Sequence, residues 1–448
     1  MKRIFFFITI ILALASCQDD SRFSTSGNLR LTFSADTLKM DTVFSKTPSS
    51  TYTFWVYNQH DEGIRLNSVR LARRNQTGFR VNVDGSYLDN SNGSQVNDLE
   101  VRRKDSLLVF VELTAAENLQ QEPQLLEDHL VFTLENGTEQ TVDLRAWVWD
   151  AERVNMLRIQ NDTVIESQKP LVVMEGIVIE EGVTLTLRNT TLYFHDQAGI
   201  DVMGSLHSEN CTMRGDRLDH MFAYLPYDRV SGQWNGVRFY ESSVDNQLTD
   251  TEVRNARAAI VCDSAAIDST QARLTMTRCI VHNAEGSGIE AVNTYLILRE
   301  CQLSNTLGPC LSVSGGIAEV SYCTLAQFYP FSADRGTAIY FSNSFQGQPL
   351  PLLRFSCEGS IVTGYEEDVV VGEPLDTVTV FNYQFTNTLL RTPKVETADS
   401  IYFQAIRWET PKDSIQGKKH FKIVDEDNLY YDFHLDSLST AQGLGCYR

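Results

Sequence analysis

The segment that decides the fold runs from residue 279 to residue 325 and reads CIVHNAEGSGIEAVNTYLILRECQLSNTLGPCLSVSGGIAEVSYCTL. In it, Cys279, Cys301 and Cys323 lie 22 residues apart, and each is followed two places later by an aliphatic residue. These aliphatic partners are Val281, Leu303 and Leu325. A repeat of this length is typical of a solenoid, in which each coil buries the apolar side chains that its neighbour would expose.

The same frame continues on both sides of this segment. The further pairs are Thr190 with Leu192, Cys211 with Met213, Thr251 with Val253 and Ser360 with Val362. Equivalent residues on stacked coils lie about 4.8 Å apart with parallel Cβ vectors, whereas a disulfide needs Cβ atoms about 3.8 Å apart. We therefore expect Cys279, Cys301 and Cys323 to be buried thiols that pack as small apolar groups. Paired Cys-x-x-Cys motifs are absent from the sequence, which argues against a structural zinc site.

A second family of short strands runs in step with the cysteine frame. Its central residues are Ile200, Val237, Ile260, Ile289, Leu311 and Ile339, at intervals that fit a basic coil of about 22 residues with insertions. Because side chains alternate along a strand, these residues point inward. The outward row is then Asp201, Arg238, Val261, Glu290, Ser312 and Tyr340.

Short strands, tight turns and the lack of a helical period together resemble the right-handed parallel β-helix of the pectin-lyase-like superfamily. The resemblance covers residues 160 to 448 and implies that residues 151–371 form the solenoid. Residues 372–448 are then expected to form its end and a cap over the last coil. Asn255, Asn283 and Asn305 share one position of the frame, which predicts a structural ladder of stacked side-chain amides.

The part of the chain before the repeat has a different pattern. Residues 29–33, 51–57, 106–113, 128–134 and 141–149 alternate or are rich in β-branched and aromatic residues, and turn clusters divide them. This predicts a β-sandwich over residues 28–150. The sequence TYTFWVYN at 51–58 resembles bacterial immunoglobulin-like modules that precede repeat domains. The expected fold class is therefore all-β throughout: an immunoglobulin-like β-sandwich followed by a parallel β-helix.

The first twenty residues are expected to be a targeting segment. Lys2 and Arg3 precede an apolar stretch at 4–14 that is too short to span a bilayer, and LASC at 14–17 resembles the bacterial lipobox. This resemblance implies a signal peptide at 1–16 and lipid on Cys17, which anchors an acylated tether at 17–27. The QDD sequence at 18–20 resembles the acidic export tag of surface lipoproteins in some Gram-negative bacteria, which implies exposure on the outer membrane.

The charge of the chain restricts its partners. The formal net charge is −20, and loss of Lys2 and Arg3 with the signal peptide makes it −22. Nucleic acid and anionic lipid both need a basic surface, so the sequence disfavours them as partners. We expect no cofactor.

The acidic residues of the outward row are too far apart for a pair of catalytic carboxyl groups. Asp201 and Glu290 would lie three coils apart, at about 14 Å, whereas glycoside hydrolysis needs carboxyl groups roughly 5–9.5 Å apart. Calcium needs six or more oxygen ligands, which the row does not group together, so no metal site is expected. Asp201 and Arg238 are expected to form a surface ion pair.

An inserted loop at 214–235 interrupts the frame. Its aromatic and charged residues suit a sugar, whose C–H faces pack on rings while its hydroxyl groups bond to charged groups. The predicted ligand-binding residues are Arg217, Tyr224, Tyr227 and Trp234 of the loop, together with Asp201 and Arg238. Two alternatives stay open: the loop packs on the solenoid with Trp234 as its anchor beside Gly236, or Asp216 or His220 acts as a general acid or base.

These observations favour a lipid-anchored envelope protein that uses its β-helix as a non-catalytic binding or scaffold surface, with glycans as the expected ligands. One alternative is a polysaccharide lyase or hydrolase with its site near the loop at 214–235. A purely structural or adhesive element is a third hypothesis, because one scaffold serves many functions.

Overall fold

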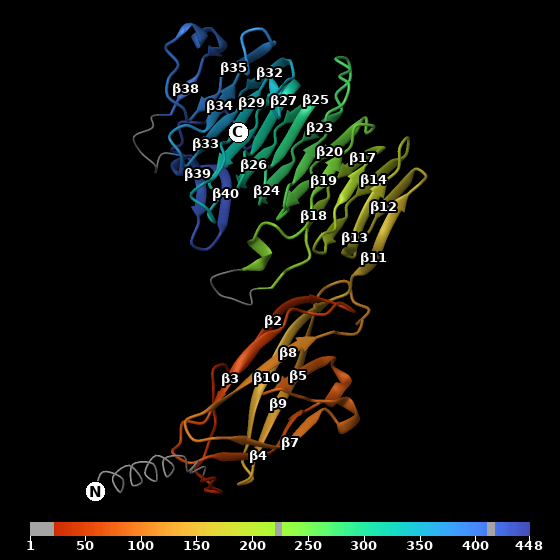
Figure 1. Ribbon diagram of the computed structural model, residues 1–448, viewed down its shortest axis with the longest axis vertical. Coiled ribbons are helices and arrows are strands. Elements are labelled where there is room, and N and C mark those ends of the chain that lie inside the picture. The colour runs from red at the N-terminus through yellow and green to blue at the C-terminus, as the bar shows by residue number, and fades with distance from the viewer. Residues whose placement is uncertain (1–21, 220–225, 410–416) are drawn as a thin grey trace, which may run out of the picture. The chain divides into compact units, whose positions relative to one another are not determined.

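A computed structural model describes residues 22–219, 226–409 and 417–448 (Figure 1). Within these residues the secondary structure consists of β-strands and short 3₁₀ turns, which confirms the all-β prediction. The contacts divide the chain into a unit that ends at Asp150 and a unit that begins at Ala151. Cys17, His220 and Tyr224 lie outside the described residues.

The N-terminal unit consists of two five-stranded sheets with a shared apolar core. One sheet has the order β1-β3-β8-β5-β6 and the other β2-β10-β9-β4-β7. The strands are β1 (Thr32–Phe33), β2 (Thr37–Phe44), β3 (Tyr52–Tyr57), β4 (Ile64–Leu71), β5 (Phe79–Val83), β6 (Ser86–Tyr87), β7 (Gln95–Val101), β8 (Ser106–Leu113), β9 (Gln124–Leu134) and β10 (Glu139–Trp149). Such a pair of packed sheets is a β-sandwich; its resemblance to immunoglobulin-like modules stays a prediction.

Alternation explains which sandwich strands were predicted. In β3, Tyr52, Phe54 and Val56 are buried and the residues between them are more exposed, as the period of two requires. Strand β2 was not predicted because its pattern is interrupted. Asp41 within it has a φ of 51°, and its pairing with β10 contains a register shift. A bulge of this kind breaks the alternation that identifies a strand in the sequence.

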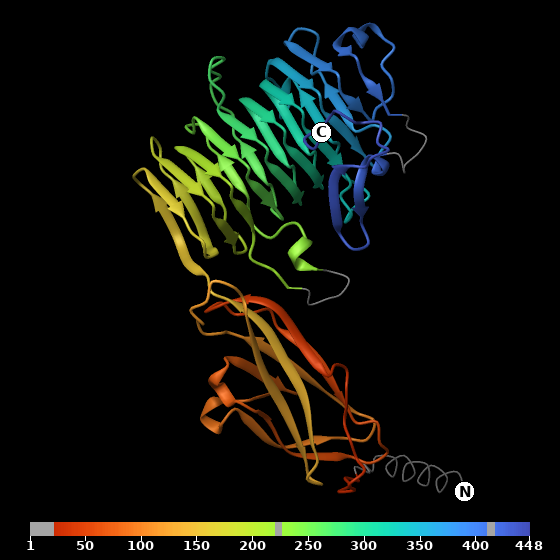
Figure 2. The same ribbon diagram turned by 180° about the vertical axis from the view of Figure 1, so that it is seen from behind.

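The second unit is a solenoid in which 26 parallel strands form one continuous sheet, as expected for a parallel β-helix (Figures 1 and 2). After β11 (Glu152–Ile159), β12 (Thr163–Glu166) and β13 (Leu171–Ile179), each coil contributes to three faces. Face A holds β15 (Thr191–Phe194), β18 (Thr212–Gly215), β21 (Glu252–Arg254), β24 (Ile280–Ala284), β26 (Gln302–Thr306), β28 (Thr324–Gln327), β33 (Ile361–Gly364), β36 (Leu389–Leu390) and β38 (Arg407–Trp408).

Face B contains the second predicted strand family. It holds β16 (Ile200–Val202), β19 (Val237–Phe239), β22 (Ile260–Cys262), the starts of β25 (Ile289–Arg299) and β27 (Leu311–Ser321), β29 (Ile339–Ser342) and β34 (Val370–Glu373). The six central residues expected to point inward pair in one register across these strands and are almost completely buried. The predicted inward and outward rows are confirmed.

Face C closes each coil between faces B and A. It holds β14 (Thr184–Arg188), β17 (Ser205–Glu209), β20 (Asn246–Thr249), β23 (Leu274–Thr277), the ends of β25 and β27, β32 (Leu352–Glu358), β35 (Phe381–Thr386) and β37 (Phe403–Gln404). Most of these strands were not predicted, because they offer only one or two inward aliphatic residues among polar ones.

The cysteine frame marks the corner between faces C and A. At this corner a residue with positive φ, such as Arg278, Glu300 or Tyr322, is followed by the buried frame residue. In eight coils the frame residue donates a hydrogen bond to the carbonyl two residues earlier; the donors are Thr190, Cys211, Thr251, Cys279, Cys301, Cys323, Ser360 and Thr388. Each side chain therefore stabilises the tight turn beneath it.

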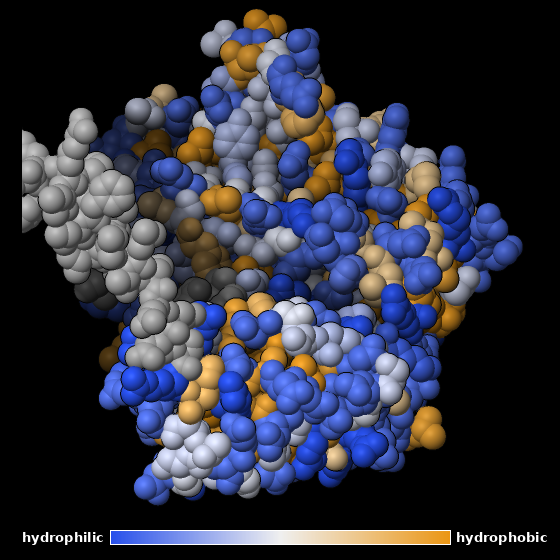
Figure 3. All heavy atoms as spheres, turned by 60° about the horizontal axis from the view of Figure 1, so that its bottom comes forward, coloured by the Kyte–Doolittle hydropathy of each residue, from blue (hydrophilic) through white to orange (hydrophobic). Residues whose placement is uncertain are grey.

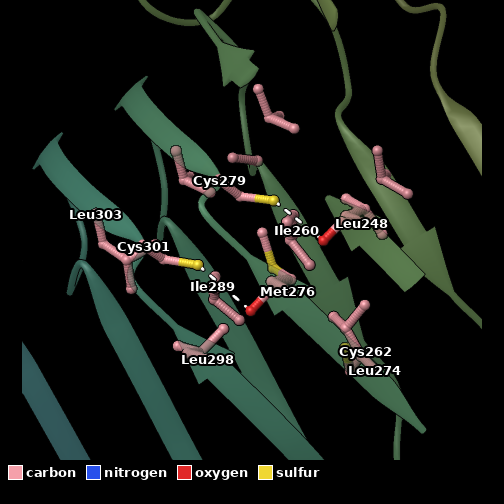
Figure 4. Close-up of a cluster of buried hydrophobic side chains, with 14 of the residues drawn as sticks. Leu248, Ile260, Cys262, Leu274, Met276, Cys279, Ile289, Leu298, Cys301 and Leu303 are labelled. Carbon is pink, nitrogen blue, oxygen red and sulfur yellow. Dashed lines mark hydrogen bonds between the residues drawn. The ribbon is translucent and has the colours of Figure 1, made fainter. Parts of the chain in front are cut away.

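The expected stack of thiols is present. Cys279 and Cys301 extend into the core from neighbouring coils, and their sulfurs also approach the carbonyl oxygens of Leu248 and Met276 at 3.3 and 3.5 Å (Figure 4). The backbone N–H of Cys301 donates to the sulfur of Cys323 at 3.4 Å. All eight cysteines in the described residues are free thiols.

The asparagine ladder is shorter than predicted. Asn283 Nδ2 donates to Asn255 Oδ1 at 3.1 Å, as expected. The Nδ2 atom of Asn305 is buried and has no hydrogen-bond partner among the described residues. Asn305 Oδ1 accepts instead from the backbone N–H of Phe328 at 3.3 Å. The ladder therefore joins two coils and stops before the third.

The solenoid extends beyond residue 371. Parallel pairing does not stop at residue 371 but continues through β34, β35, β36 and β37 to β38, which ends at Trp408. Residues 417–448, with the hairpin β39 (Phe421–Asp425) and β40 (Tyr430–Leu435), lie along the side of the coils over face A (Figure 2). Phe421, Phe433 and Leu444 pack there against Phe328 and Ile361. The last parallel strands, up to β38, therefore lie within the range 372–448 that was expected to hold the end of the solenoid, and residues 417–448 cover a lateral face of several coils. The predicted cap over the last coil stays a prediction.

One face of the molecule is largely hydrophilic. In the face shown in Figure 3, hydrophilic side chains predominate and hydrophobic ones show between them. Among the described residues, no helix is long and apolar enough to cross a membrane.

Candidate functional site

A groove crosses face B over strands β16, β19 and β22. At the N-terminal ends of these strands lies a hollow of about 500 Å³, lined by Gln197, Asn235 and Arg257 among others. At their C-terminal ends lies a hollow of about 700 Å³, lined in part by loops 241–245 and 265–273. Tyr240 lines both hollows. Cavities of this size are typical of binding sites for small molecules.

Two predicted residues, Asp201 and Arg238, lie on the floor of the groove. They are paired in register on adjacent coils, but the expected ion pair between them is replaced by two diagonal contacts. Arg238 forks onto Asp263, with both nitrogen–oxygen distances at 2.9 Å. The hydroxyl of Tyr240 donates to Asp201 Oδ1 at 3.2 Å. The Arg238 guanidinium also lies 5.2 Å from the centre of the Tyr240 ring.

The network fixes the protonation states of Arg238 and Tyr240. The hydrogen bonds that Arg238 donates to Asp263 raise the pKa of its guanidinium, which therefore stays charged. Burial, followed by the charge of Asp201, raises the pKa of Tyr240, so its hydroxyl stays protonated and continues to donate. An aromatic ring is thus held between a carboxylate and a guanidinium, which is an arrangement suited to a hydroxyl-rich ligand.

Glycines let the coils approach closely under the first hollow. Gly176, Gly199 and Gly236 lie one above another at the starts of the face B strands. Gly236 has a φ of 89°, and a Cβ atom there would lie 1.8 Å from the carbonyl oxygen of Ala258. Only glycine fits this position without a shift of the backbone.

A polar chain edges the same hollow. Arg257 forms an ion pair with Asp196, and its Nη1 donates to Asn235 Oδ1 at 3.1 Å. Asn235 Nδ2 in turn donates to the carbonyl of Gln197 at 2.7 Å. The edge of the hollow therefore carries oriented donors and acceptors.

Trp234 of the inserted loop is completely buried; it stacks on Phe194 at 4.3 Å and donates from Nε1 to the carbonyl of Arg254 at 2.8 Å. This burial leaves its ring no surface for a ligand and favours the alternative in which Trp234 anchors the loop beside Gly236. Arg217 covers the ring of Tyr227 at 3.6 Å, so these two predicted residues contact each other.

Asp216, the catalytic candidate that the structure describes, has a partner that was not predicted. Its Oδ2 lies 2.7 Å from His195 Nδ1 on the neighbouring coil. The carboxyl side chain is 10% exposed and the imidazole 49% exposed. The hydrogen bond with Asp216 raises the pKa of His195 in spite of partial burial. This pair orients an imidazole at the surface, and neither of its residues is among those that line the groove.

The carboxylates of the groove are occupied by donors of the network. Both oxygens of Asp263 accept from Arg238, and Asp201 accepts from Tyr240. Within residues 22–219, 226–409 and 417–448, no group of three His, Cys, Asp or Glu side chains is placed to hold a metal ion.

Sequence reasoning found Asp201 and Arg238 but missed Tyr240 and Asp263. Both missed residues lie two places beyond an outward residue of the row, Arg238 and Val261. The alternation that identified the row continues for one more step past each strand, and this signal predicts both residues.

Comparisons with known proteins support the N-terminal assignment. Residues 1–18 match the family described as prokaryotic membrane lipoprotein lipid attachment site. The protein is therefore a membrane-anchored protein of the cell envelope, attached through its N-terminal cysteine. No curated protein matches the chain.

Solved structures resemble the chain only distantly. The catalytic domain of Agl-KA aligns at 10% identity and a TM-score of 0.27, over 82% of this chain and 73% of that chain. A protein of unknown function from Porphyromonas gingivalis W83 aligns at 12% identity and a TM-score of 0.20, over 30% of this chain and 60% of that chain. A family 123 glycoside hydrolase from Clostridium perfringens aligns at 5% identity and a TM-score of 0.20, over 29% of this chain and 30% of that chain. The alignment thus spans less than two thirds of the latter two structures, and at these scores no functional argument follows.

Proposed function

We propose that this protein is a lipid-anchored envelope protein whose solenoid binds a glycan, without cleaving it, in the groove of face B. The observation that carries the proposal is the ring of Tyr240, held between Asp201 and Arg238 where two hollows meet. Sugar rings pack their C–H faces on such aromatic groups, and their hydroxyls bond to carboxylates and guanidinium groups.

The acidic tag at 18–20 supports a position on the outer membrane surface of a Gram-negative cell, where glycans are accessible. The net charge of the mature chain, −22, opposes binding of polyanionic glycans and therefore favours neutral ones.

A glycan array with the mature protein tests the proposal, scored for both retention and product release. We expect retention of at least one neutral glycan and no shortened products. Tyr240→Ala and Arg238→Gln should each weaken retention by about tenfold, since both remove a central contact.

Arg278→Gln is the matched control for Arg238→Gln. Arg278 forks onto Asp250 at 2.7 Å with a side-chain exposure of 50%, close to the 52% of Arg238, but it does not line the groove. Equal losses in the two variants would overturn the assignment of the groove. Shortened products would instead establish the lyase or hydrolase alternative.

A further inference from the structure

A second cleft, separate from the groove, lies between face A and the C-terminal segment. Three distant parts of the chain line it: strands β21, β24 and β26, the 3₁₀ turn η3 (Tyr227–Arg229), and β40 with Tyr447. Its volume is about 380 Å³, which is within the range of small-molecule sites.

Hydrogen bonds hold η3 in place against face A. Asn255 Nδ2 donates to the carbonyl of Asp228 at 2.7 Å, and Asn283 Nδ2 donates to the carbonyl of Arg229 at 2.6 Å. The two amides of the short ladder therefore also position the inserted loop.

The C-terminal wall is fixed in the same way. The hydroxyl of Tyr447 donates to Gln302 Oε1 at 2.8 Å, and Arg229 Nη1 donates to the carbonyl of Asn428 at 2.8 Å. Because the walls are bonded to one another before a ligand arrives, binding there needs little further ordering of side chains.

Both guanidinium groups that line the cleft are paired with carboxylates: Arg254 with Glu252, and Arg229 with Asp228. The carboxylate of Asp432 contacts the imidazole of His434 at 2.6 Å. The remaining imidazole, that of His282, stays neutral because burial and then the charge of Arg254 lower its pKa to about 3. An anionic ligand would find both guanidinium groups already paired, so the cleft favours a sugar without an acidic group.

Aromatic rings form much of the C-terminal wall. The imidazole of His434 stacks on Tyr447 at 4.1 Å, and Tyr431 stacks on Phe433 at 5.9 Å. Tyr430 stands at the rim with 51% of its surface exposed. Rings beside paired polar groups suit a ligand that has apolar C–H faces and many hydroxyl groups.

We propose that this cleft is a second binding site, for a neutral sugar unit. The site is independent of the groove on face B, since the two share no lining residue.

Saturation-transfer NMR on the full mature chain in detergent tests this inference. The probes are glucose, galactose, mannose and N-acetylglucosamine as neutral sugars, with glucuronate as the anionic counterpart. We expect transfer to at least one neutral sugar and none to glucuronate. Tyr430→Ala should weaken binding of the neutral sugar at least fivefold. Tyr87 is a tyrosine of similar exposure on the sandwich, and Tyr87→Ala should leave this binding unchanged.

Glu252→Gln tests the argument from charge. This substitution leaves Arg254 without its carboxylate, so the variant should gain binding of glucuronate. The inference is overturned if no neutral sugar binds, if binding survives Tyr430→Ala, or if the unaltered protein binds glucuronate equally well. Tyr240→Ala should leave this site intact, so that failure of one site is distinguishable from failure of the other.

Discussion

Cys301 shows what the corner between faces C and A requires of a single residue. Its side chain is fully buried, and its sulfur donates to the carbonyl of Arg299 at 3.3 Å. Equivalent corners carry Thr251 and Ser360, which donate the same bond through a hydroxyl. The position therefore selects a small side chain with one donor.

Substitution of Cys301 tests this requirement. Cys301→Ser keeps both the size and the donor, so we expect its free energy of unfolding to fall by less than about 1 kcal/mol. Cys301→Leu loses the donor and overpacks the core, so it should cost about 1–3 kcal/mol. Urea unfolding followed by circular dichroism measures both; similar losses in the two variants would contradict the explanation.

His282 predicts how the solenoid responds to acid. Its folded-state pKa of about 3 lies below the unfolded value of about 6.5. Between these two values the imidazole is protonated in the unfolded chain but neutral in the folded one. Its contribution to the free energy of unfolding is therefore fully present above about pH 6.5 and decreases as the pH is lowered. The slope from this group is at most about 1.4 kcal/mol per pH unit.

His282→Gln removes the titrating group, and Gln can still bond to Ser304, which His282 Nδ1 contacts at 2.8 Å. Urea unfolding curves at pH 7 and pH 5 should then differ less for the variant than for the parent protein. An equal loss of unfolding free energy between pH 7 and pH 5 in the two proteins would show that other groups cause the acid sensitivity.

At the scale of elements, the regular coils could be predicted and the irregular ones could not. Val281, Leu303 and Leu325 follow their cysteines at a constant interval, so the sequence alone places β24, β26 and β28. Strands such as β20, with the sequence NQLT, resemble turns because only Leu248 marks the core. Beyond residue 371 the frame pair of Thr388 and Leu390 follows Ser360 and Val362 after 28 residues instead of 22, and ring stacks such as Phe385 on Phe403 at 5.3 Å enter the core. The period therefore becomes hard to recognise in the sequence although the coils continue.

The close stacking of coils at Gly236 is testable with one added methyl group. Gly236→Ala combines a φ of 89° with a clash against the backbone of Ala258, so it should cost on the order of 3 kcal/mol. Gly182 has a φ of 73° but open space around it, and Gly182→Ala should cost only about 1 kcal/mol. Thermal unfolding compares the two. Equal losses would mean that backbone conformation alone, and not coil spacing, requires glycine at 236.

At the scale of the whole molecule, the lipid anchor decides where the solenoid acts. The match to the lipoprotein attachment site ends at residue 18, one residue after Cys17. Cys17→Ala should move the protein from the membrane fraction to the soluble fraction of its host and abolish labelling by radioactive palmitate. Retention of the variant in membranes would show that another contact anchors the protein.

The site was predicted less completely than the fold, and the reason is long-range contact. Asp201 and Arg238 were identified because they follow a local alternation. The second cleft was missed because Tyr430 and Tyr447 approach face A only when the chain end folds back over coils well over a hundred residues earlier. No local pattern encodes that approach.

A buried charge cluster joins the C-terminal segment to the last coils. Arg391 Nη1 lies 3.3 Å from Glu409 Oε1, and His420 Nε2 lies 3.5 Å from the same oxygen. Thr363 donates to Glu409 Oε2 at 2.7 Å, and Ser439 contacts His420 Nδ1 at 2.9 Å. Because all these groups are almost completely buried, loss of one charge leaves another uncompensated.

Glu409→Met and Arg391→Met should therefore each lower the free energy of unfolding by about 3–5 kcal/mol and expose residues 417–448 to limited proteolysis. The double variant removes both charges from the cluster, so its loss should be much smaller than the sum of the two single losses. Urea unfolding of all four proteins completes the double-mutant cycle. Additive losses would mean that the two side chains act independently, and that the cluster does not couple the segment to the last coils beyond its hydrogen bonds and its apolar contacts with Phe328 and Ile361.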